Sequence, residues 1–302
     1  MNCLFKKCFV IGLFLLLTLG SLSCVSASTY VVNESWSNDD IQVLIDNKGL
    51  NVTELIFSKT TDGIYRDICL IIYNSINIVS NEDILLNGTD NELDYAFNIL
   101  GHDTTITGFN IIGYSTGISA SFLDNLILSN NSFYSNDNGI SVSCSNNVSI
   151  LNNNFSGDDN SDSIFITGSN NVNVFDNDIQ DSGSGINIME SNNTQITTNN
   201  VSNTKSHGIS IDNSENVNVS NNALDNNSIG ISSNNANNLK INDNNIKNSR
   251  SDGISTYKSR KNKIIDNDID DAFNGISVYD SEDVNVSKNK VKNSKNKGIS
   301  LD

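Results

Sequence analysis

The sequence has few cysteines and no proline. Five cysteines occur in 302 residues, and three of them lie within the first 27. The other two, Cys69 and Cys144, are too few in a chain of this length to form a disulfide framework. Cys69 stands in the apolar run ICLIIY and is predicted to be a small core residue. This scarcity excludes a small disulfide-stabilised scaffold.

Positive charge is also scarce over most of the chain. Lysine and arginine number 18 against 35 aspartates and glutamates, which gives a formal net charge of −17. Residues 28–239 contain 25 acids and 4 bases, whereas residues 240–302 contain 10 acids and 12 bases. Because binding of nucleic acid requires a basic track, this acidic body argues against a nucleic-acid partner. The favoured interpretation is a solvated surface that keeps an exported protein soluble.

Only one long apolar run is present, at the N-terminus. It extends from Phe9 to Leu19 after the basic pair Lys6 and Lys7, and Val25-Ser26-Ala27 supplies a small-x-small cleavage pattern. Residues 1–27 are therefore predicted to be a secretory signal peptide, and the run is too short to span a membrane. Cys24 leaves a lipoprotein alternative open. We expect no transmembrane segment after cleavage, and a protein that is secreted or held at the cell surface.

Asparagine is abundant, at 55 of 302 residues, while aliphatic residues persist at regular positions. Disordered low-complexity chains lose those aliphatic residues, so the pattern indicates a repeat. Glycine-isoleucine pairs mark its frame, with successive spacings of 22, 24, 22, 23, 22, 23, 22 and 23 residues. The anchor residues are Gly117, Gly139, Ser163, Gly185, Gly208, Gly230, Gly253, Gly275 and Gly298.

The apolar residues of each repeat predict three short strands. They stand 1, 3, 9, 11 and 16 positions after the anchor, and the spacing of two within clusters is the period of a strand. Strands this short cannot bury an apolar face alone. If each pairs with its equivalent in the next repeat, inward side chains stack ~4.8 Å apart. The sequence therefore predicts an all-β fold, a parallel β-helix.

One polar position is as regular as the apolar ones. It lies 14 residues after the anchor, between the second and third predicted strands, where the chain must bend. Asparagine tolerates the left-handed conformation of a bend, and its amide can both donate to and accept from neighbouring coils. We therefore predict a structural asparagine ladder. Its members are Asn131, Asn153, Asn177, Asn199, Asn222, Asn244, Asn267 and Asn289.

The outward position of the first strand, two residues after the anchor, is rich in serine. It carries hydroxyls and essentially no acid-base chemistry, with Phe165 and Asn187 in two of the coils. This row is a candidate ligand-facing ladder. Its serines are Ser119, Ser141, Ser210, Ser232, Ser255, Ser277 and Ser300.

The recurrent coil GISI…NVNVSNN resembles the right-handed parallel β-helix repeat of the pectate lyase-like superfamily. The likeness is to the subset shared by NosD-like periplasmic proteins and adhesin-like surface proteins of methanogenic archaea. It covers residues 95–302 closely and residues 28–94 more loosely. In the looser part, SNDDIQVLIDNKG places Ile41, Leu44 and Ile45 on one helical face, with Ser37 or Asn38 as N-cap. The resemblance implies that this helix caps the coil stack before the first irregular coils.

Enzymes on this fold carry constellations that the sequence does not reproduce. His207 precedes an anchor glycine, as in a polysaccharide hydrolase, but the paired acids of the neighbouring coils are missing and Asp162 stands alone. A lyase needs a basic proton abstractor beside a calcium ion or a cationic cluster. Arg250 and Lys258 lie in bends near the serine row, where long cations are usually just solvated. An epimerase-like Asp-Pro-His motif is excluded by the absence of proline.

Metal binding has one weak candidate, the acidic bend GDDNSDS. Asp158, Asp159 and Asp162 could hold calcium through their oxygens, although a plain acidic loop is favoured. We expect no catalytic residues and no other cofactor.

The resemblance favours an exported, non-catalytic, adhesin-like β-helix protein that binds an extracellular glycan or a cell-surface polymer. A polysaccharide-processing lyase, epimerase or hydrolase on the same fold is the alternative, and a purely structural envelope component is the second. The sequence given ends at GISLD, within a first strand. An uncovered coil end exposes unpaired strand edges, so end-to-end self-association is also expected.

Overall fold

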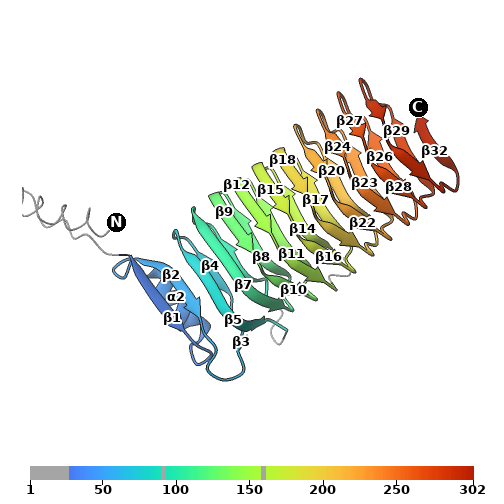
Figure 1. The fold of residues 1–302 in the computed structure, drawn as a ribbon. Helices are drawn as coiled ribbons and strands as arrows, with labels where there is room; N and C mark the ends of the chain where they lie inside the picture. Colours follow the sequence, from blue (N-terminus) through green and yellow to red (C-terminus); the bar gives the residue numbers. More distant parts are fainter. Residues whose placement is uncertain (1–26, 90–92, 158–160) are drawn as a thin grey trace, which may run out of the picture.

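The computed structural model describes residues 27–89, 93–157 and 161–302. Over these residues the chain winds into a right-handed parallel β-solenoid of about 12 turns, with only 3% helix (Figure 1). The prediction of an all-β parallel β-helix with one short N-terminal helix is confirmed. The predicted signal peptide lies outside the described residues, apart from Ala27.

One long side of the solenoid is an 11-stranded sheet in which each strand pairs with its equivalent in the next coil. From β8 to β29, the anchor residue and the isoleucine after it are buried near the start of the strand. The strands are β4 (Leu70–Ile72), β6 (Tyr95–Ile99), β8 (Thr116–Ser121), β11 (Asn138–Ser143), β14 (Asp162–Thr167), β17 (Ser184–Met189), β20 (His207–Asp212), β23 (Ile229–Asn234), β26 (Asp252–Tyr257), β29 (Asn274–Tyr279) and β32 (Lys297–Leu301).

A 21-stranded sheet forms the rest of the wall. Its regular part is two columns of short strands separated by a bend. The first column contains β9 (Asp124–Ser129), β12 (Asn146–Leu151), β15 (Asn170–Phe175), β18 (Asn192–Thr197), β21 (Asn218–Ser220), β24 (Lys240–Asn242), β27 (Lys263–Ile265) and β30 (Asn285–Ser287). The second contains β10 (Ser132–Tyr134), β13 (Asn154–Ser156), β16 (Asp178–Gln180), β19 (Asn200–Ser202), β22 (Ala223–Asp225), β25 (Asn245–Lys247), β28 (Asp268–Asp270) and β31 (Lys290–Lys292).

The N-terminal coils are less regular because two of their strands are long. β5 pairs with β2 and with β3, and β7 pairs with β9 and with β10, so each long strand continues across the bend. The N-terminal elements are β1 (Ser28–Val32), α2 (Asn38–Asp46), β2 (Val52–Phe57), β3 (Ile64–Arg66), β5 (Asn77–Asn87) and β7 (Thr104–Ile112).

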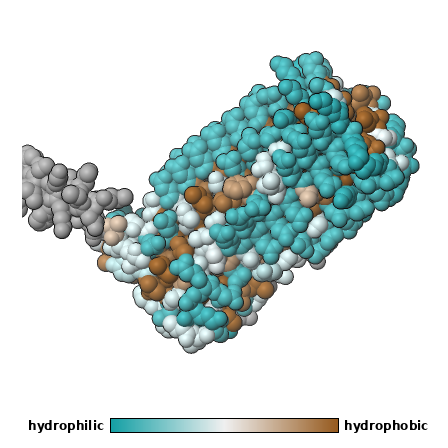
Figure 2. Space-filling view, in the orientation of Figure 1, coloured by the Kyte–Doolittle hydropathy of each residue, from teal (hydrophilic) through white to brown (hydrophobic). Residues whose placement is uncertain are grey.

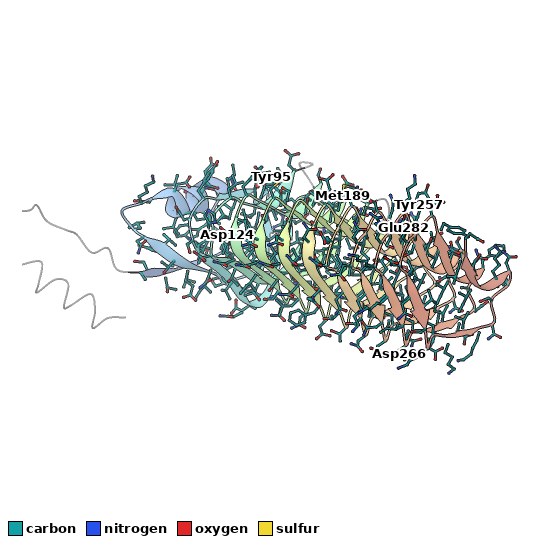
Figure 3. All side chains as sticks on the ribbon, turned by 90° about the horizontal axis from the view of Figure 1, so that it is seen from above. Tyr95, Asp124, Met189, Tyr257, Asp266 and Glu282 are labelled. Carbon is teal, nitrogen blue, oxygen red and sulfur yellow. The ribbon has the colours of Figure 1, made fainter. Side chains whose placement is uncertain are left out.

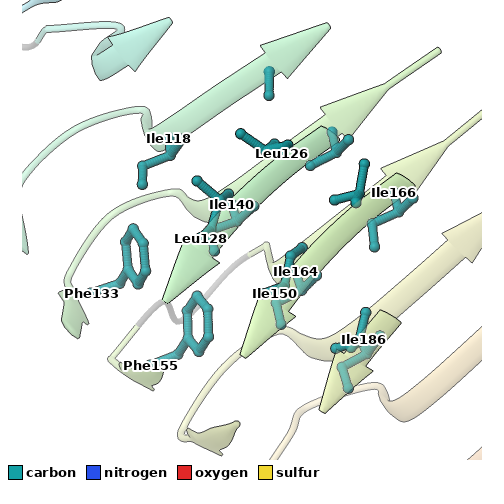
Figure 4. Close-up of a cluster of buried hydrophobic side chains, with 14 of the residues drawn as sticks. Ile118, Leu126, Leu128, Phe133, Ile140, Ile150, Phe155, Ile164, Ile166 and Ile186 are labelled. Carbon is teal, nitrogen blue, oxygen red and sulfur yellow. The ribbon is translucent and has the colours of Figure 1, made fainter. Parts of the chain in front are cut away.

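The core is a set of columns of identical or similar side chains. Ile118, Ile140 and Ile164 are register partners on successive strands, and each is fully buried. Phe133 and Phe155 stack with ring centroids 4.8 Å apart and planes inclined by 7° (Figure 4). Glycine is favoured at the anchor because a Cβ on Gly185 would lie 2.5 Å from the carbonyl oxygen of Gly208. Close coil-to-coil approach therefore explains the glycine of eight anchors, and Ser163 takes its place in one coil.

Helix α2 covers the end of the stack. Ser37 is its N-cap and forms a capping box with Asp40, and Ile41, Leu44 and Ile45 are buried as the sequence predicts. The side-chain amide of Gln42 accepts a hydrogen bond from the Ile71 amide and donates one to the Ile71 carbonyl, both 2.9 Å long. Because Ile71 lies on the first strand of the 11-stranded sheet, Gln42 satisfies an edge that would otherwise be open.

The eight asparagines of the predicted ladder stack at the bend between the two strand columns. In each step the backbone amide and the side-chain Nδ2 of one asparagine donate to the Oδ1 of the next. For Asn199 these distances to Asn222 Oδ1 are 2.9 and 3.0 Å, and Nδ2 also donates to the Val174 carbonyl at 3.0 Å. Asn199 is 1% exposed. The column therefore satisfies the buried amide of Asn199 and buried backbone groups of the coil before it.

The left-handed residue of this bend is not the ladder asparagine itself. Positive φ angles occur one position earlier, for example at Asn152 (55°), Thr198 (56°) and Lys288 (57°). The expectation that the ladder position needs a residue tolerant of this conformation is therefore wrong. Asparagine at that position is explained by its hydrogen bonds alone, and the strained position before it accepts several residue types.

A second buried polar ladder, which the sequence analysis did not identify, lies at the bend after the 11-stranded sheet. The backbone amide of Ser145 donates to Ser169 Oγ at 3.1 Å, and the amide of Ser169 donates to Ser191 Oγ at 3.0 Å. Ser191 continues the pattern to Ser214 Oγ at 3.1 Å. The sequence does contain a signal for this ladder, because most coils have a serine six residues after the anchor.

Glu34 fixes the loop that follows β2. Its carboxylate accepts hydrogen bonds from the amides of Thr60, Thr61 and Gly63 at 2.9–3.1 Å and from the Thr60 hydroxyl at 2.6 Å. Burial raises the pKa of this carboxyl, but the hydrogen bonds from Thr60, Thr61 and Gly63 outweigh that effect and hold the pKa far below 4.5.

We predict that Asn199→Ala lowers the free energy of unfolding by ~1–3 kcal/mol, because it leaves the Asn177 amide and the Val174 carbonyl without partners. Urea denaturation followed by circular dichroism measures the change. The exposed neighbour Asn200 is the matched control, and Asn200→Ala is expected to stay within ~0.5 kcal/mol of the unmodified protein. Equal stability of both variants would contradict a stabilising ladder.

We predict that Glu34→Gln lowers the melting temperature at neutral pH and that the difference shrinks in acid. A carboxyl whose pKa is depressed by folding stabilises the protein above its unfolded value of 4.5, and this stabilisation is lost as the pH falls through the folded pKa. Thermal melts between pH 3 and pH 7 measure the trend. Glu54→Gln is the control, since Glu54 accepts a single exposed hydrogen bond from Thr29. A difference that is independent of pH would overturn the assignment.

Candidate functional site

The outer face of the 11-stranded sheet carries the predicted serine row. Most of its members lie between two buried residues, as Ser119 does between Ile118 and Ala120, so the side chain points away from the core. Ser300 differs, because Ile299 and Leu301 beside it are exposed. Successive members are register partners. Ser119 pairs with Ser141, and Ser232 pairs with Ser255. The row therefore places one small polar group per coil, ~4.8 Å apart, along the side of the solenoid.

The serines of this row are not equally available to a ligand. Ser210 and Ser300 are 7% exposed and Ser277 is fully buried. Their hydroxyls donate to Asp212 at 2.9 Å, Asp302 at 2.8 Å and Asp252 at 2.8 Å respectively. The expectation that all seven serines face a ligand is therefore wrong for these three, because acidic neighbours bind and cover them.

Four serines keep the exposure that a binding surface requires. They are half-buried, and within the described residues their hydroxyls make no side-chain hydrogen bond. The four are Ser119, Ser141, Ser232 and Ser255.

The row is interrupted in its middle by two larger side chains. Phe165 on β14 projects outward between the buried residues Ile164 and Ile166. Its register partner on β17 is Asn187, whose Nδ2 donates to Asp162 Oδ2 at 2.9 Å. An aromatic ring, an amide and a carboxylate thus stand together where the other coils present hydroxyls.

His207 lies on the next strand, β20, beside the same interruption. Its Nδ1 is 3.0 Å from Ser206 Oγ. Burial lowers the pKa of the imidazole, and the charges of Asp212 and Asp162 oppose but do not cancel that effect. The lowered pKa favours the neutral form of the side chain. The sequence shows no acid paired with Asp162. When the coils stack, Asp162 and Asp212 both come near His207.

An open groove of about 440 Å³ runs along the edge of these strands. It is large enough for a small ligand. Its lining is polar and comes from four consecutive coils, namely Asn138, Ser161, Asp162, Gly183, Ser184, Lys205 and Ser206.

A second aromatic feature lies nearer the C-terminus of the same face. Tyr257 and Tyr279 are register partners on β26 and β29, and Tyr257 is 38% exposed. The ammonium group of Lys258 lies 4.8 Å from the centroid of the Tyr257 ring. Met189 and Tyr257 project from the same side of the solenoid (Figure 3). The sequence analysis named Lys258 only as a solvated cation and did not identify the tyrosines.

Most of the solenoid surface in view is hydrophilic, and hydrophobic residues show over the N-terminal coils and at the C-terminal end (Figure 2). Ile299 and Leu301 there are 49% and 63% exposed. No helix among the described residues is both long and apolar enough to span a membrane.

The calcium candidate is only partly described. Asp158 and Asp159 lie outside the described residues, and the Asp162 carboxylate accepts a hydrogen bond from Asn187. Among the residues that the structure describes, no three histidine, cysteine or acidic side chains are grouped closely enough to hold a metal ion.

Two family profiles match the chain. The right handed beta helix region matches residues 84–231, and the periplasmic copper-binding protein NosD matches residues 190–302. Comparison with curated proteins gives no match. Copper sites use grouped imidazole, thiolate or thioether ligands. His207 and Met189 lie on different strands without such a grouping, so the described residues do not fit a copper site.

Similar solved structures include PfbA, a surface adhesin of Streptococcus pneumoniae, with a TM-score of 0.69, 14% identity, and coverage of 91% of this chain and 93% of that one. The Dettilon tailspike protein has a TM-score of 0.66 at 14% identity, covering 90% and 68%. The A-module of the Azotobacter vinelandii mannuronan C-5 epimerase AlgE6 has a TM-score of 0.53 at 12% identity, covering 92% and 91%.

Identities this low show the fold alone. The profile matches together extend over the same coils that the in-register strands build. On this combination of sequence repeat, coil geometry and shared architecture, the chain is a right-handed parallel β-helix repeat protein.

Proposed function

We propose that this chain is an exported, non-catalytic protein that binds an extended glycan or another cell-surface polymer along the outer face of the 11-stranded sheet. The observation that carries the proposal is the outward row of polar residues, in which two pairs of half-buried serines, Ser119 with Ser141 and Ser232 with Ser255, are in register on neighbouring strands. A linear polymer of sugars presents hydroxyls at regular intervals, and a rigid row of donors and acceptors can bind them without ordering a loop.

The similar solved structures support a polymer-binding function. One is a bacterial surface adhesin and another is a tailspike protein. Export through the predicted signal peptide, residues 1–27, would place the acidic, hydroxyl-rich surface where such polymers occur. The acidic surface would also keep the exported protein soluble.

We predict that Ser232→Gln weakens binding to the polymer about fivefold to tenfold, because its longer side chain blocks one step of the row and removes a hydroxyl. A glycan array identifies the ligand, and biolayer interferometry on that ligand measures the affinity. Ser149→Gln is the control, since Ser149 is an outward residue of β12 on another side of the solenoid. Equal weakening by both variants would reject this face, and a blank array would favour a purely structural envelope component.

A polysaccharide-processing enzyme is the competing function, because an epimerase shares the fold and His207 lies close to Asp162 and Asp212. We predict no turnover when the protein is incubated with polyuronates or neutral glycans. Ultraviolet absorbance detects unsaturated ends, reducing-sugar assays detect hydrolysis, and NMR detects epimerised units. A signal in any of the three that disappears in His207→Gln would establish catalysis instead.

A further inference from the structure

We propose that the interruption of the serine row holds a subsite for one uncharged pyranose ring. Phe165 would stack against the ring, and Asp162, which Asn187 holds in place, would bind its hydroxyls. This inference rests on the proposed function, since it locates a specific contact within the polymer-binding face.

The first argument is the position of Phe165. Every other described member of the row from Ser119 onward is a serine or an asparagine, so a phenylalanine here puts an apolar ring on a polar face. It is held by the buried isoleucines on either side of it in β14. Its register partners are small or short, namely Ser141 and Asn187, and they do not extend beyond it. An aromatic face is negative and attracts the polarised C–H bonds of a sugar ring.

The second argument is the arrangement of polar groups beside that ring. Asn187 is adjacent to Phe165 in register, and it donates to one oxygen of Asp162. The other carboxylate oxygen of Asp162 makes no hydrogen bond within the described residues, so it can accept from sugar hydroxyls. Because Asn187 already fixes the carboxylate, binding would order few side chains.

The third argument is space. Asp162 lines the open groove of about 440 Å³, together with Ser184 and Ser206 on the following coils. Of the three subsite residues, Asp162 lines this groove, Asn187 is bonded to Asp162, and Phe165 is the register partner of Asn187. Among the described coils from Ser119 onward, no other has an aromatic residue in the serine row.

The charge of the surroundings selects the class of sugar. The Asp162 carboxylate accepts a hydrogen bond from Asn187, and the Asp212 carboxylate accepts one from Ser210, which is the register partner of Asn187. Among the described residues that line the groove, Lys205 is the one cation, and it already has an interaction within the protein. A uronate would bring a further negative charge toward two carboxylates, so the site favours a neutral sugar.

Saturation-transfer NMR with methyl glycosides of glucose, galactose, mannose and N-acetylglucosamine tests the proposal, with glucuronate as the anionic comparison. We predict transfer to the ring protons of at least one neutral glycoside. Phe165→Ser should weaken this binding at least tenfold, and Asn187→Ser should weaken it less. Both substitutions install the residue that other coils carry at the same position, so the fold should persist and circular dichroism checks it.

Tyr257→Ser is the matched control, because it removes an outward aromatic ring from the same sheet three coils beyond β17. It should leave glycoside binding unchanged. The subsite is rejected if no neutral glycoside binds, if glucuronate binds more tightly, or if Phe165→Ser binds as well as the unmodified protein. Polymer binding that depends on Ser232 but not on Phe165 would reject the subsite and retain the proposed function. Glycoside binding without polymer binding would retain the subsite and reject the proposed function.

Discussion

The structure depends on parallel, in-register hydrogen bonding between coils. Each strand contributes only three to six residues in the regular region, and such a strand has no stability alone. When every coil repeats the same register, each buried side chain rests on its equivalent, as Ile118 does on Ile140 and Phe133 does on Phe155. One spacing error would displace a residue from every column, so the length of 22 to 24 residues is held nearly constant.

Parallel stacking creates a difficulty at the bends, where backbone amides leave the sheets yet remain buried. Two polar ladders resolve it. Asparagine side chains bond along one bend, and serine hydroxyls accept from the amides of the preceding coil along another. Both devices work only because an equivalent residue lies directly above and below. The abundance of asparagine and serine is therefore partly a structural requirement, and it does not by itself indicate a ligand.

The outer face has fewer constraints, and there the coils differ from one another. A serine is sufficient to keep the first strand in place, so a phenylalanine at 165 or a tyrosine at 257 is not required by the fold. In a repeat protein such departures are the positions where function is to be sought. Three departures, Phe165, Asn187 and His207, lie on the neighbouring strands β14, β17 and β20 near a groove, which distinguishes this region from a surface of scattered substitutions.

Periodicity and a local cap were enough to predict the coil length, the buried columns, the asparagine positions and the helix that begins after Ser37. The sequence also predicted the serine row, but not that Ser210, Ser277 and Ser300 would be covered. Their acidic partners are set by which side chains meet across and along strands. The stacking of the coils brings Asp162 and Asp212 near His207, because residues 50 apart in the chain become neighbours in the fold. Periodicity fixes what every coil has in common, whereas contacts between unlike residues on different coils require the register in three dimensions.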